Sequence, residues 1–332
     1  MPRFSIIIPV YNRPGEIADL LESLAAQTVK NFEVVITEDG STIPCRDVCD
    51  RYAADIDIRY YVQDNIGRSP ARNNSMEHAR GDYFVFFDSD CVIPPTYFAT
   101  LAEALDADPL DCFGGPDAAH ESFSDMQKAI NFAMTSFLTT GGIRGGKASL
   151  EKFTPRTFNM GFSRKVYDTV GEFREMFSED IDMSKRIEAA GFRTGLIRQC
   201  PVYHKRRLSF KKFFRQVHVF GMSRITLKLL YPGSMKIVHA LPACFVIGLL
   251  MLLLGAIFVS PWFLAPVWVY IVALFLSALV STKSVRVALM AVPAAFIQLV
   301  GYGTGFIKAF FTKIILGRGR NIEEEIAARK GK

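Results

Sequence analysis

Tyr83-Phe84-Val85-Phe86-Phe87-Asp88-Ser89-Asp90 is the stretch that decides the fold: five apolar residues, then at once two carboxylates two positions apart. An apolar run of aromatic and β-branched residues is typical of a strand inside a parallel sheet that is covered on both faces. Carboxylates at the end of such a strand face the crevice where open α/β sheets bind ligands. They repel each other unless a cation lies between them, so the pair indicates a divalent metal with a diphosphate behind it. A plain polar turn is the alternative, because Asp and Ser favour turns.

The rest of the amino-terminal part repeats this strand pattern. Strand-like runs lie at residues 4–10, 32–37, 56–62 and 83–87. Helical patterns lie between them: one contains Pro14 in its first turn and has Asn12 as its expected N-cap, and another runs from residue 68 or 69 to 79. Alternating strands and helices predict an α/β fold with a mostly parallel sheet and flanking helices.

The pattern becomes looser after Asp90. Residues 114–146 are rich in glycine and mixed polar residues, which predicts loops or a lid over the crevice, with a helix at 124–138. A further strand is expected from residue 193 to 197. No second soluble domain is evident, so we expect residues 1–205 to form one catalytic domain.

The carboxyl-terminal part has the composition of membrane helices. Residues 237–259 contain no charged residue apart from His239, residues 262–281 contain none, and residues 285–316 contain only Arg286, Lys308 and Lys313. Apolar stretches of about 20 residues are long enough to cross a bilayer as helices. We therefore expect a basic juxtamembrane segment at 206–236, a membrane region at 237–316 and a basic tail at 317–332.

The formal net charge of +6 is concentrated beside the membrane region. The basic residues there are Lys205, Arg206, Arg207, Lys211, Lys212, Arg215, Arg224, Lys228 and Lys236. This placement favours anionic membrane lipids over nucleic acid as the partner. The positive-inside rule, and an amino terminus that leads straight into a strand without a signal peptide, predict a multi-pass protein of the plasma or inner membrane with a cytoplasmic catalytic domain.

The third apolar stretch leaves the number of crossings open. Its 32 residues are long for one span, and Pro293, Gly301, Gly303 and Gly305 are expected to interrupt it. A cytoplasmic tail requires an even number of crossings. Two crossings followed by a re-entrant or interfacial segment at 302–316 satisfy this requirement, and so do four short crossings.

Polar clusters follow the four predicted strands at their carboxyl ends. They are Pro9-Val10-Tyr11-Asn12, Glu38-Asp39-Gly40-Ser41, Asp64-Asn65-Ile66-Gly67-Arg68 and Asp88-Ser89-Asp90. Each cluster alone is only a turn signature. All four at the same edge of one sheet indicate a nucleotide site.

With these motifs the sequence resembles glycosyltransferase family 2, a family with the GT-A fold. The matching segments span about residues 4–205 and also include Gly67-Arg68-Ser69-Pro70-Ala71-Arg72-Asn73, Gly81-Asp82-Tyr83, Asn159-Met160-Gly161-Phe162-Ser163-Arg164, Gly171-Glu172-Phe173 and Ser178-Glu179-Asp180-Ile181-Asp182. Each motif is weak alone, whereas the ordered set is specific. The resemblance implies a Rossmann-like GT-A domain that uses a nucleotide-sugar donor.

The resemblance also implies roles for the residues of the donor site. Asp39 would accept hydrogen bonds from the base, which we expect to be uracil, and Pro9 and Tyr11 would line the base and ribose. Asp88 would face the ribose or the metal, and Asp90 would bind Mg²⁺ or Mn²⁺ across the diphosphate. Further donor-site residues are expected to be Asn12, Asp64, Arg68, Arg72 and Ser89. For the two arginines, a salt bridge on a helix face is the alternative.

Two further assignments concern catalysis and the metal. Asp180 is the expected general base, with Glu179 assisting, although these acids could merely complement a helix start that is capped by Ser178. His204 is the expected third metal ligand after Asp88 and Asp90, because some members of the family carry a histidine at this place. An exposed histidine without a ligand role is the alternative.

One departure from the family narrows the expected reaction. Processive synthases carry a Gln-x-x-Arg-Trp motif near the membrane junction, whereas here Gln216 is followed by Val217-His218-Val219-Phe220. We therefore expect a metal-dependent, inverting enzyme that transfers one sugar to a hydroxyl of a lipid-linked glycan in cell-surface polysaccharide or glycolipid synthesis. Transfer to a polyprenyl phosphate is the alternative reaction, and an inactive sugar-nucleotide-binding scaffold is the alternative of another class. No protein partner is predicted.

Overall fold

The computed structural model describes residues 1–118, 123–141, 153–205, 209–319 and 321–329, and the chain divides into two compact units. Unit 1 comprises Met1–His120, Phe153–Lys205 and Ile326–Lys332. Unit 2 comprises Glu121–Lys152 and Arg206–Glu325. Residues 119–122 and 142–146 of the predicted lid lie outside the described residues, so the lid stays a prediction.

Unit 1 is built on a seven-stranded sheet with the order β3-β2-β1-β4-β8-β6-β9. Its strands are β1 (Phe4–Val10), β2 (Phe32–Asp39), β3 (Asp57–Gln63), β4 (Tyr83–Phe86), β6 (Cys112–Gly114), β8 (Met160–Ser163) and β9 (Thr194–Leu196). The strands β1 to β4 pair in parallel, and β8 runs antiparallel to both β4 and β6. The predicted mostly parallel α/β sheet is confirmed.

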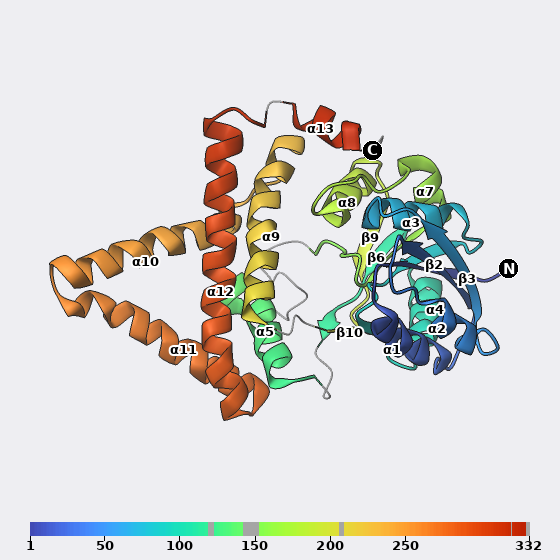
Figure 1. The fold of residues 1–332 in the computed structure, drawn as a ribbon, viewed down its shortest axis with the longest axis horizontal. Coiled ribbons are helices and arrows are strands. Elements are labelled where there is room, and N and C mark those ends of the chain that lie inside the picture. Colours follow the sequence, from blue (N-terminus) through green and yellow to red (C-terminus); the bar gives the residue numbers. More distant parts are fainter. Residues whose placement is uncertain (119–122, 142–152, 206–208, 320, 330–332) are drawn as a thin grey trace. The chain divides into compact units, whose positions relative to one another are not determined.

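Helices cover both faces of this sheet, as Figure 1 shows. The helices α1 (Pro14–Ala25), α2 (Arg46–Tyr52) and α4 (Tyr97–Ala107) cover one face, and α3 (Arg68–Glu77), α7 (Arg164–Val170) and α8 (Glu179–Ala189) cover the other. Alternate residues of β1 separate the two cores: Ile6 and Ile8 belong to the first, and Ile7 to the second. Burial on both faces explains why the central strand β1 is almost continuously apolar.

A three-stranded sheet of very short strands lies beside the main sheet. It has the order β5-β10-β7, with β5 (Cys91–Val92), β7 (Asp117–Ala118) and β10 (Val202–His204). In the antiparallel pairing of β5 with β10, His204 lies opposite Cys91. This register brings His204 next to the end of β4.

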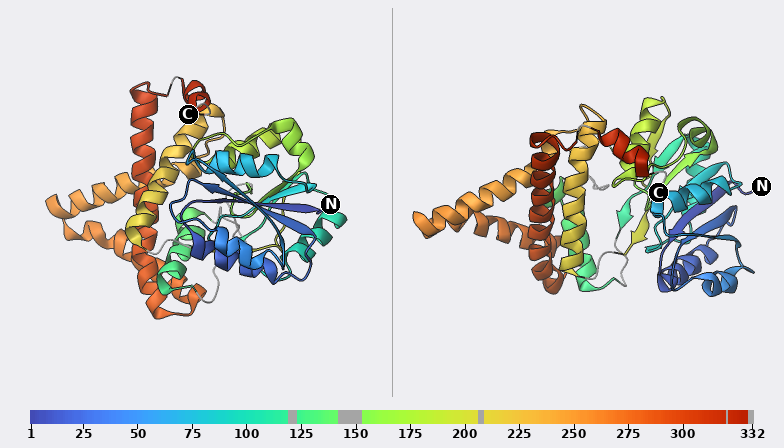
Figure 2. Two further views of the ribbon diagram at one scale, coloured as in Figure 1. Left: turned by 45° about the vertical axis from the view of Figure 1, so that its right-hand side comes forward. Right: turned by 45° about the horizontal axis from the view of Figure 1, so that its top comes forward.

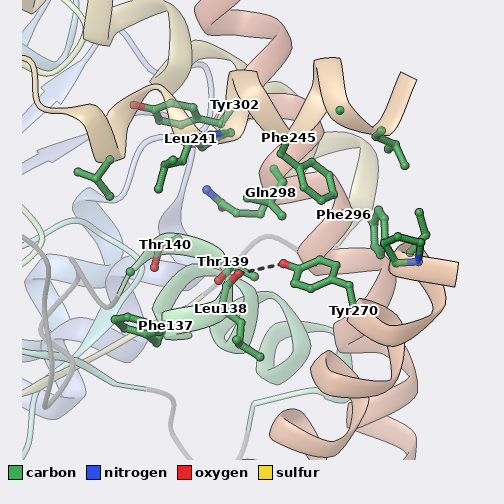
Figure 3. Close-up of a pocket in the computed structure, with 18 of the residues that line it drawn as sticks. Phe137, Leu138, Thr139, Thr140, Leu241, Phe245, Tyr270, Phe296, Gln298 and Tyr302 are labelled. Atoms are coloured by element: carbon green, nitrogen blue, oxygen red, sulfur yellow. Dashed lines mark hydrogen bonds between the residues drawn. The ribbon is translucent and has the colours of Figure 1, made fainter. Parts of the chain in front are cut away.

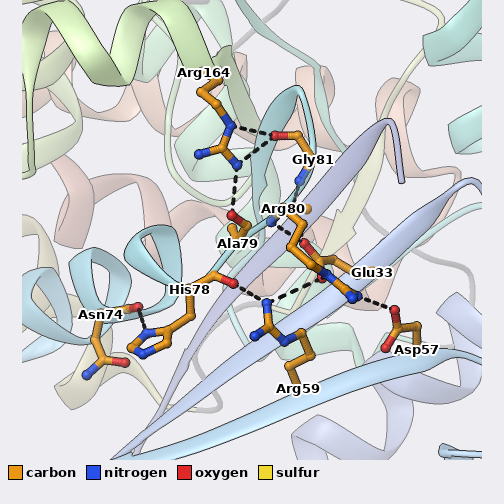
Figure 4. A network of polar contacts seen from close by, with 10 residues as sticks. Glu33, Asp57, Arg59, Asn74, His78, Ala79, Arg80, Gly81 and Arg164 are labelled. Atoms are coloured by element: carbon orange, nitrogen blue, oxygen red, sulfur yellow. Dashed lines mark hydrogen bonds and ion pairs between the residues drawn. The ribbon is translucent and has the colours of Figure 1, made fainter. Parts of the chain in front are cut away.

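A polar network ties the amino-terminal edge of the main sheet together (Figure 4). Glu33 is fully buried and accepts hydrogen bonds from the Ser5 hydroxyl at 2.7 Å and from Nε of Arg80 at 2.7 Å. Arg80 also pairs with Asp57 of β3. Burial by itself raises the pKa of Glu33, but the hydrogen bonds from Ser5 and Arg80 outweigh it and hold the pKa below its usual value. This network lies at the end of the sheet opposite to the carboxylates of the site, so we interpret it as structural.

Unit 2 is helical. Its helices are α5 (Asp125–Thr135), α6 (Phe137–Thr140), α9 (Phe210–Leu230), α10 (Leu241–Phe258), α11 (Ala265–Thr282) and α12 (Val285–Ala309), with the short turns η1 (Ile237–His239), η2 (Pro261–Leu264) and η3 (Phe310–Ile315). A last helix, α13 (Ile322–Arg329), crosses the boundary between the two units. The predicted helix at 124–138 is present as α5 and α6, and Ser124 caps α5 with a capping box.

Helices α9 and α12 lie side by side in both views of Figure 2. Three glycines permit this close approach. A Cβ at Gly221 would lie 2.0 Å from the carbonyl oxygen of Tyr302, one at Gly305 would lie 2.0 Å from that of His218, and one at Gly301 would lie 2.5 Å from Val217. The glycines of the third apolar stretch therefore serve helix packing rather than helix interruption.

Three helices of the described residues are long and apolar enough to cross a membrane: Leu241–Phe258, Pro261–Thr282 and Val285–Ile315. They indicate that the chain is associated with a membrane.

The expected interruption at Pro293 is wrong, because α12 continues through this residue to Ala309 and changes to a π-helix only at Phe310. Ring and backbone strain at a proline is tolerated in such helices when neighbouring groups satisfy the freed carbonyl. Because this helix is unbroken, it disfavours the interpretation in which the third apolar stretch forms two short crossings.

Candidate functional site

The carboxyl ends of β1, β2, β3 and β4 meet at one edge of the main sheet. The parallel register aligns Pro9 with Thr37 and Asp39 with Gln63. The polar clusters that follow these strands therefore belong to one rim, as their sequence positions predict. Pro9 is half-buried in this rim, whereas Tyr11 has a side chain that is 49% exposed and can stack against a flat ligand.

Asp39 organises the loop after β3. Its Oδ1 accepts hydrogen bonds from Nε2 of Gln63 at 2.8 Å and from the Ile66 amide at 3.0 Å, and its Oδ2 accepts one from the Gly67 amide at 3.0 Å. Asp64 lies in the same loop with an exposed side chain. The carboxylate of Asp39 is thus fixed in place at the rim, and its predicted contact with a base stays a prediction.

Asn12 does not cap helix α1, so the sequence-based prediction of this cap is wrong. The helix has Arg13 at its N-cap position, and Asn12 adopts a positive φ of 54°. The Asn12 side-chain oxygen accepts hydrogen bonds from the Ile43 amide at 2.9 Å and the Thr42 hydroxyl at 3.1 Å. Asn12 therefore joins the loop after β1 to the loop after β2, which shapes the rim.

Arg72 links the end of β4 to the start of α8. Its side chain is buried; Nη2 donates to Oδ1 of Asp88 at 2.9 Å, and Nη1 donates to Oε1 of Glu179 at 2.7 Å. The other oxygen of Glu179 accepts from Nη2 of Arg68 at 2.8 Å. Both arginines are therefore held in ion pairs, and Glu179 faces two guanidinium groups rather than an open crevice.

Asp90 and His204 lie together at the end of β4. Nε2 of His204 is 3.1 Å from Oδ1 of Asp90, and with Cys91 the two residues form a group whose potential ligand atoms all lie within 4.8 Å of one another. Complete burial raises the pKa of the Cys91 thiol well above its usual value, which favours the neutral thiol, a poor metal ligand. A carboxylate oxygen and an imidazole nitrogen suit Mn²⁺ and, for the oxygen, Mg²⁺.

Neighbouring groups orient the His204 ring. Phe158 stacks on it with ring centroids 5.0 Å apart and an angle of 18° between the planes. Nδ1 of His204 lies 4.0 Å from Oδ2 of the buried side chain of Asp117 in β7. Carboxylates on the far nitrogen of a metal-binding histidine commonly fix the tautomer that leaves the other nitrogen available.

Two residues of the site, Asp88 and Ser89, contact other side chains of the protein. Asp88 lies on Arg72, outside the group of Asp90, Cys91 and His204, and its contact with a metal or a ribose stays a prediction. Ser89 is buried, and its hydroxyl lies 3.3 Å from Oε2 of Glu16 in α1. Nη1 of Arg13 lies 3.6 Å from Oδ2 of Asp90, which places a positive charge beside this carboxylate.

Asp180 lies in the first turn of α8, as predicted. Ser178, at the N-cap position, has a positive φ of 65° and makes no capping hydrogen bond with its side chain, so the predicted serine cap is wrong. Oδ1 of Asp180 accepts from the Ile181 amide at 2.8 Å, and Oδ2 lies 3.8 Å from Nη1 of Arg156. Burial raises the pKa of Asp180, Arg156 lowers it and Glu179 raises it, with a net increase. A carboxylate with a raised pKa is a stronger proton acceptor than an ordinary aspartate.

Arg13, Asp117 and Arg156 are residues of this site that sequence reasoning misses. Arg13 is next to the motif that ends at Asn12, so proximity to the motif is a signal that could have found it. Asp117 and Arg156 lie in the loosely patterned region after Cys112. Their roles depend on contacts with His204 and Asp180, which no local sequence pattern reveals.

Comparison with known proteins defines the class. The family model described as glycosyl transferase family 2 matches residues 5–171, which is half of the chain. The chain therefore belongs to glycosyltransferase family 2. Among solved structures, mannosyltransferase PcManGT from Pyrobaculum calidifontis, in complex with GDP-Man and Mn²⁺, matches with a TM-score of 0.59 at 18% identity, over 94% of this chain and 88% of that chain. This likeness supports the GT-A fold.

Two curated relatives differ in how much of each protein the match covers. Glycosyltransferase GlyA of Streptococcus pneumoniae serotype 4 is 38% identical over 104 residues, which make up 31% of this chain and 15% of GlyA. This chain therefore spans only a small part of GlyA's length. The GalNAc(5)-diNAcBac-PP-undecaprenol beta-1,3-glucosyltransferase of Campylobacter jejuni subsp. jejuni serotype O:2 is 22% identical over 230 residues, which are 68% of each protein. By its name, that relative acts on an undecaprenol-linked glycan.

Proposed function

We propose that this chain is a metal-dependent, inverting glycosyltransferase that moves one sugar from a UDP-sugar to a hydroxyl of a lipid-linked glycan at the plasma or inner membrane. The observation that carries the proposal is the pairing of His204 with Asp90 at 3.1 Å, at the carboxyl end of a central strand. Two potential ligands of different chemistry from distant segments fit a divalent cation that holds a diphosphate. PcManGT, which shares the fold, binds a nucleotide-sugar together with Mn²⁺.

The donor would lie along the rim of strand ends. Asp39 would accept hydrogen bonds from the uracil base, with Pro9, Tyr11 and Asn12 beside the base and ribose. Asp64 would contact the donor from the loop after β3, whose backbone amides at Ile66 and Gly67 donate hydrogen bonds to Asp39. The stable position of Asp39 supports this role, because a base-reading group has to be fixed before the ligand arrives.

Asp90 and His204 would hold Mn²⁺ or Mg²⁺. Asp88, which pairs with Arg72 in this structure, and Ser89 would contribute to the donor site from the same loop. The O and N donor set fits such an ion. The cation would supply Lewis-acid stabilisation of the nucleoside diphosphate that leaves. Arg68 would add positive charge to this leaving group, since its side chain is 52% exposed although it also pairs with Glu179. Arg72 is buried, so we propose that it positions Asp88 and Glu179.

Asp180 would act as the general base. The acceptor hydroxyl gives its proton to a carboxylate oxygen of Asp180 while the acceptor oxygen forms its bond to the anomeric carbon. The bond from this carbon to the diphosphate oxygen breaks on the opposite side, which inverts the configuration. The raised pKa of Asp180 supports this role, and Glu179 holds the start of α8 in place through its two arginines.

The acceptor would be a glycan that is attached to a membrane lipid. The three apolar helices would keep the enzyme at the membrane, and the exposed Lys211 and Lys212 of α9 would attract anionic lipids from the cytoplasmic side. The Campylobacter jejuni relative, whose name includes an undecaprenol-linked acceptor, supports this class of acceptor.

A donor and acceptor panel tests the proposal with the full chain in nanodiscs. Release of nucleoside diphosphate is measured for UDP- and GDP-sugars with Mn²⁺, with Mg²⁺ and with a chelator, and with either a lipid-linked glycan extract or a polyprenyl phosphate. We expect turnover with a UDP-sugar, a metal and the glycan extract. Transfer to polyprenyl phosphate alone would overturn the proposed acceptor, and full turnover in chelator would overturn the metal site.

A further inference from the structure

Unit 2 contains an apolar cavity of about 570 Å³ between its helices (Figure 3). Its walls come from α6, α10, α11 and α12, and all of its lining residues belong to unit 2. Phe245, Leu249 and Leu252 of α10 and Phe296 of α12 supply apolar surface. This volume is in the range of sites that hold small organic ligands.

The polar groups at one wall of the cavity are bonded within the protein. The Tyr270 hydroxyl donates to the carbonyl oxygen of Leu138 at 2.9 Å, which joins α11 to α6. The Thr139 hydroxyl donates to the Ala133 carbonyl, and the Thr140 hydroxyl donates to the Met134 carbonyl. These three hydroxyl groups already have hydrogen-bond acceptors within the protein, so none of them requires a ligand as a partner.

Gln298 of α12 differs from these groups. Its side chain is 7% exposed and lines the cavity, and Figure 3 shows it extending between Leu241 and Phe245 on one side and Thr139 on the other. Within the part of the chain that the structure describes, its buried Oε1 has no hydrogen-bond partner. A buried amide oxygen without a hydrogen-bond partner lowers the stability of the fold. Its position inside an apolar cavity indicates a ligand that has both an apolar part and a hydrogen-bonding group.

The surroundings of the cavity indicate that its ligand enters from the membrane rather than from water. The cavity lies among the three helices that are apolar enough to cross a membrane. Outward side chains of α10 and α11, such as Met251 and Val269, are exposed and apolar. A hydrocarbon chain can enter from a bilayer, whereas a water-soluble molecule would have to cross it.

We infer that this cavity binds a glycerolipid with a free hydroxyl, of the diacylglycerol type. Its acyl chain lies against Phe245, Leu249 and Phe296. The hydroxyl donates to Oε1 of Gln298, and an ester carbonyl of the lipid can accept from the Gln298 amide nitrogen. An isoprenoid chain offers no hydrogen-bonding group below its phosphate, so it would leave Gln298 unpaired. This lipid site is independent of the proposed sugar transfer.

Gly248 provides a variant that fills the cavity. It lines the cavity, and apart from its chain neighbours and the backbone of its own helix no atom lies within 4 Å of the position that its Cβ would occupy. Gly248→Phe therefore places a ring in the cavity without a backbone clash. Met251→Phe is the matched control, because Met251 is on the same helix, is 65% exposed and does not line the cavity. Gln298→Leu removes the amide and keeps a similar volume.

The test uses the full chain in phosphatidylcholine nanodiscs and a diacylglycerol with a photoreactive group in its acyl chain. Labelled peptides are mapped by mass spectrometry, and unlabelled dioleoylglycerol or a polyprenyl phosphate serves as competitor. We expect labels on α10 or α12, at least fivefold less labelling with Gly248→Phe, at least threefold less with Gln298→Leu, and none of these losses with Met251→Phe. Melting temperatures confirm that each variant is folded.

Two results would overturn the inference. Equal labelling of the wild type and of both cavity variants would show that the lipid does not bind in this cavity. Competition by polyprenyl phosphate that is as strong as that by dioleoylglycerol, and is unchanged by Gln298→Leu, would show that the occupant is an isoprenoid instead.

Discussion

Nε2 of His204 lies 3.1 Å from Oδ1 of Asp90, although the two residues are 114 positions apart in the sequence. The link is the register of two very short strands, in which His204 lies opposite Cys91, the residue after Asp90. A change in this pairing would move the imidazole away from the carboxylate. The proposed metal site therefore depends on β10 being held in place by β7 and β5.

Removal of the His204 imidazole is expected to weaken Mn²⁺ binding. His204→Ala should lower the affinity by at least about tenfold, the range known for losses of groups that orient metal ligands. Isothermal titration calorimetry with Mn²⁺ in the presence of UDP measures the effect. His78→Gln is the control, since His78 lies at the end of α3 away from Asp90. His204 is not the exposed histidine of the alternative interpretation, since its side chain is only 14% exposed. An unchanged affinity would show that its imidazole does not bind the metal.

Replacement of Asp180 tests the proposed base. Asp180→Asn should lower kcat by about 10²- to 10⁴-fold, the contribution typical of general base catalysis, and should leave the KM for the donor nearly unchanged. Steady-state release of nucleoside diphosphate at saturating acceptor measures both quantities. Asp168→Asn, on an exposed position of α7, should retain wild-type rates. Full activity of Asp180→Asn would contradict the assignment.

The neighbouring guanidinium gives a separate test through pH. Arg156 lowers the pKa of Asp180, against the larger effect of burial, so Arg156→Gln should raise this pKa further. The base is active when deprotonated, and the acidic limb of the profile of kcat/KM should move to higher pH by about one unit. Rate profiles of the wild type, Arg156→Gln and the exposed control Arg193→Gln provide the comparison. A limb that does not move, or moves to lower pH, would show that Arg156 does not act on the base.

How far the sequence predicts this molecule depends on the range of the interactions. The runs that became β1, β2 and β4 are mostly apolar, and the run of β3 is rich in aromatic and β-branched residues, so these strands and the polar residues at their ends can be recognised locally. The small sheet of β5, β7 and β10 cannot be recognised, because strands of two or three residues have no periodicity and exist only through tertiary pairing. The same reason explains why Asp117 and Arg156 escape prediction.

Capping shows a second limit. Asn12 and Ser178 have the right residue types for N-caps, yet both adopt positive φ, and the Asn12 side chain bonds to the loop at Thr42 and Ile43 instead. Asn and Ser offer the same hydrogen bonds to a helix start and to a neighbouring loop. Which partner they take is decided by the loop that tertiary structure brings close, and single-sequence patterns contain no information on that loop.

Arg72 provides a test of stability. It is 2% exposed and pairs with Glu179, which is also 2% exposed. Arg72→Met leaves the buried carboxylate of Glu179 without one of its two partners and should lower the free energy of unfolding by about 3–5 kcal/mol, as for other broken buried pairs. Hydrogen exchange of the α3 and β4 amides in the full chain measures this loss. Arg193→Gln, which breaks an exposed pair with Asp108, should cost at most about 1 kcal/mol. Equal losses in both variants would contradict the proposed role of Arg72.

The amino-terminal edge of the sheet should give the domain part of its dependence on pH. Burial raises the pKa of Glu33, but Ser5 and Arg80 outweigh it and lower the folded-state pKa below the unfolded value of about 4.3. The stabilisation by this carboxylate is therefore complete above the unfolded pKa and is lost as the pH falls through the folded-state pKa.

Glu33→Gln should lower the free energy of unfolding by about 1–3 kcal/mol at neutral pH, because the Ser5 and Arg80 donors lose a charged acceptor. It should also flatten the dependence of this free energy on pH in the acid range. Hydrogen exchange of the β1 and β2 amides across this pH range measures both effects, with the exposed Glu103→Gln of α4 as the control. A variant that loses stability in acid as steeply as the wild type would place the acid sensitivity elsewhere in the sheet.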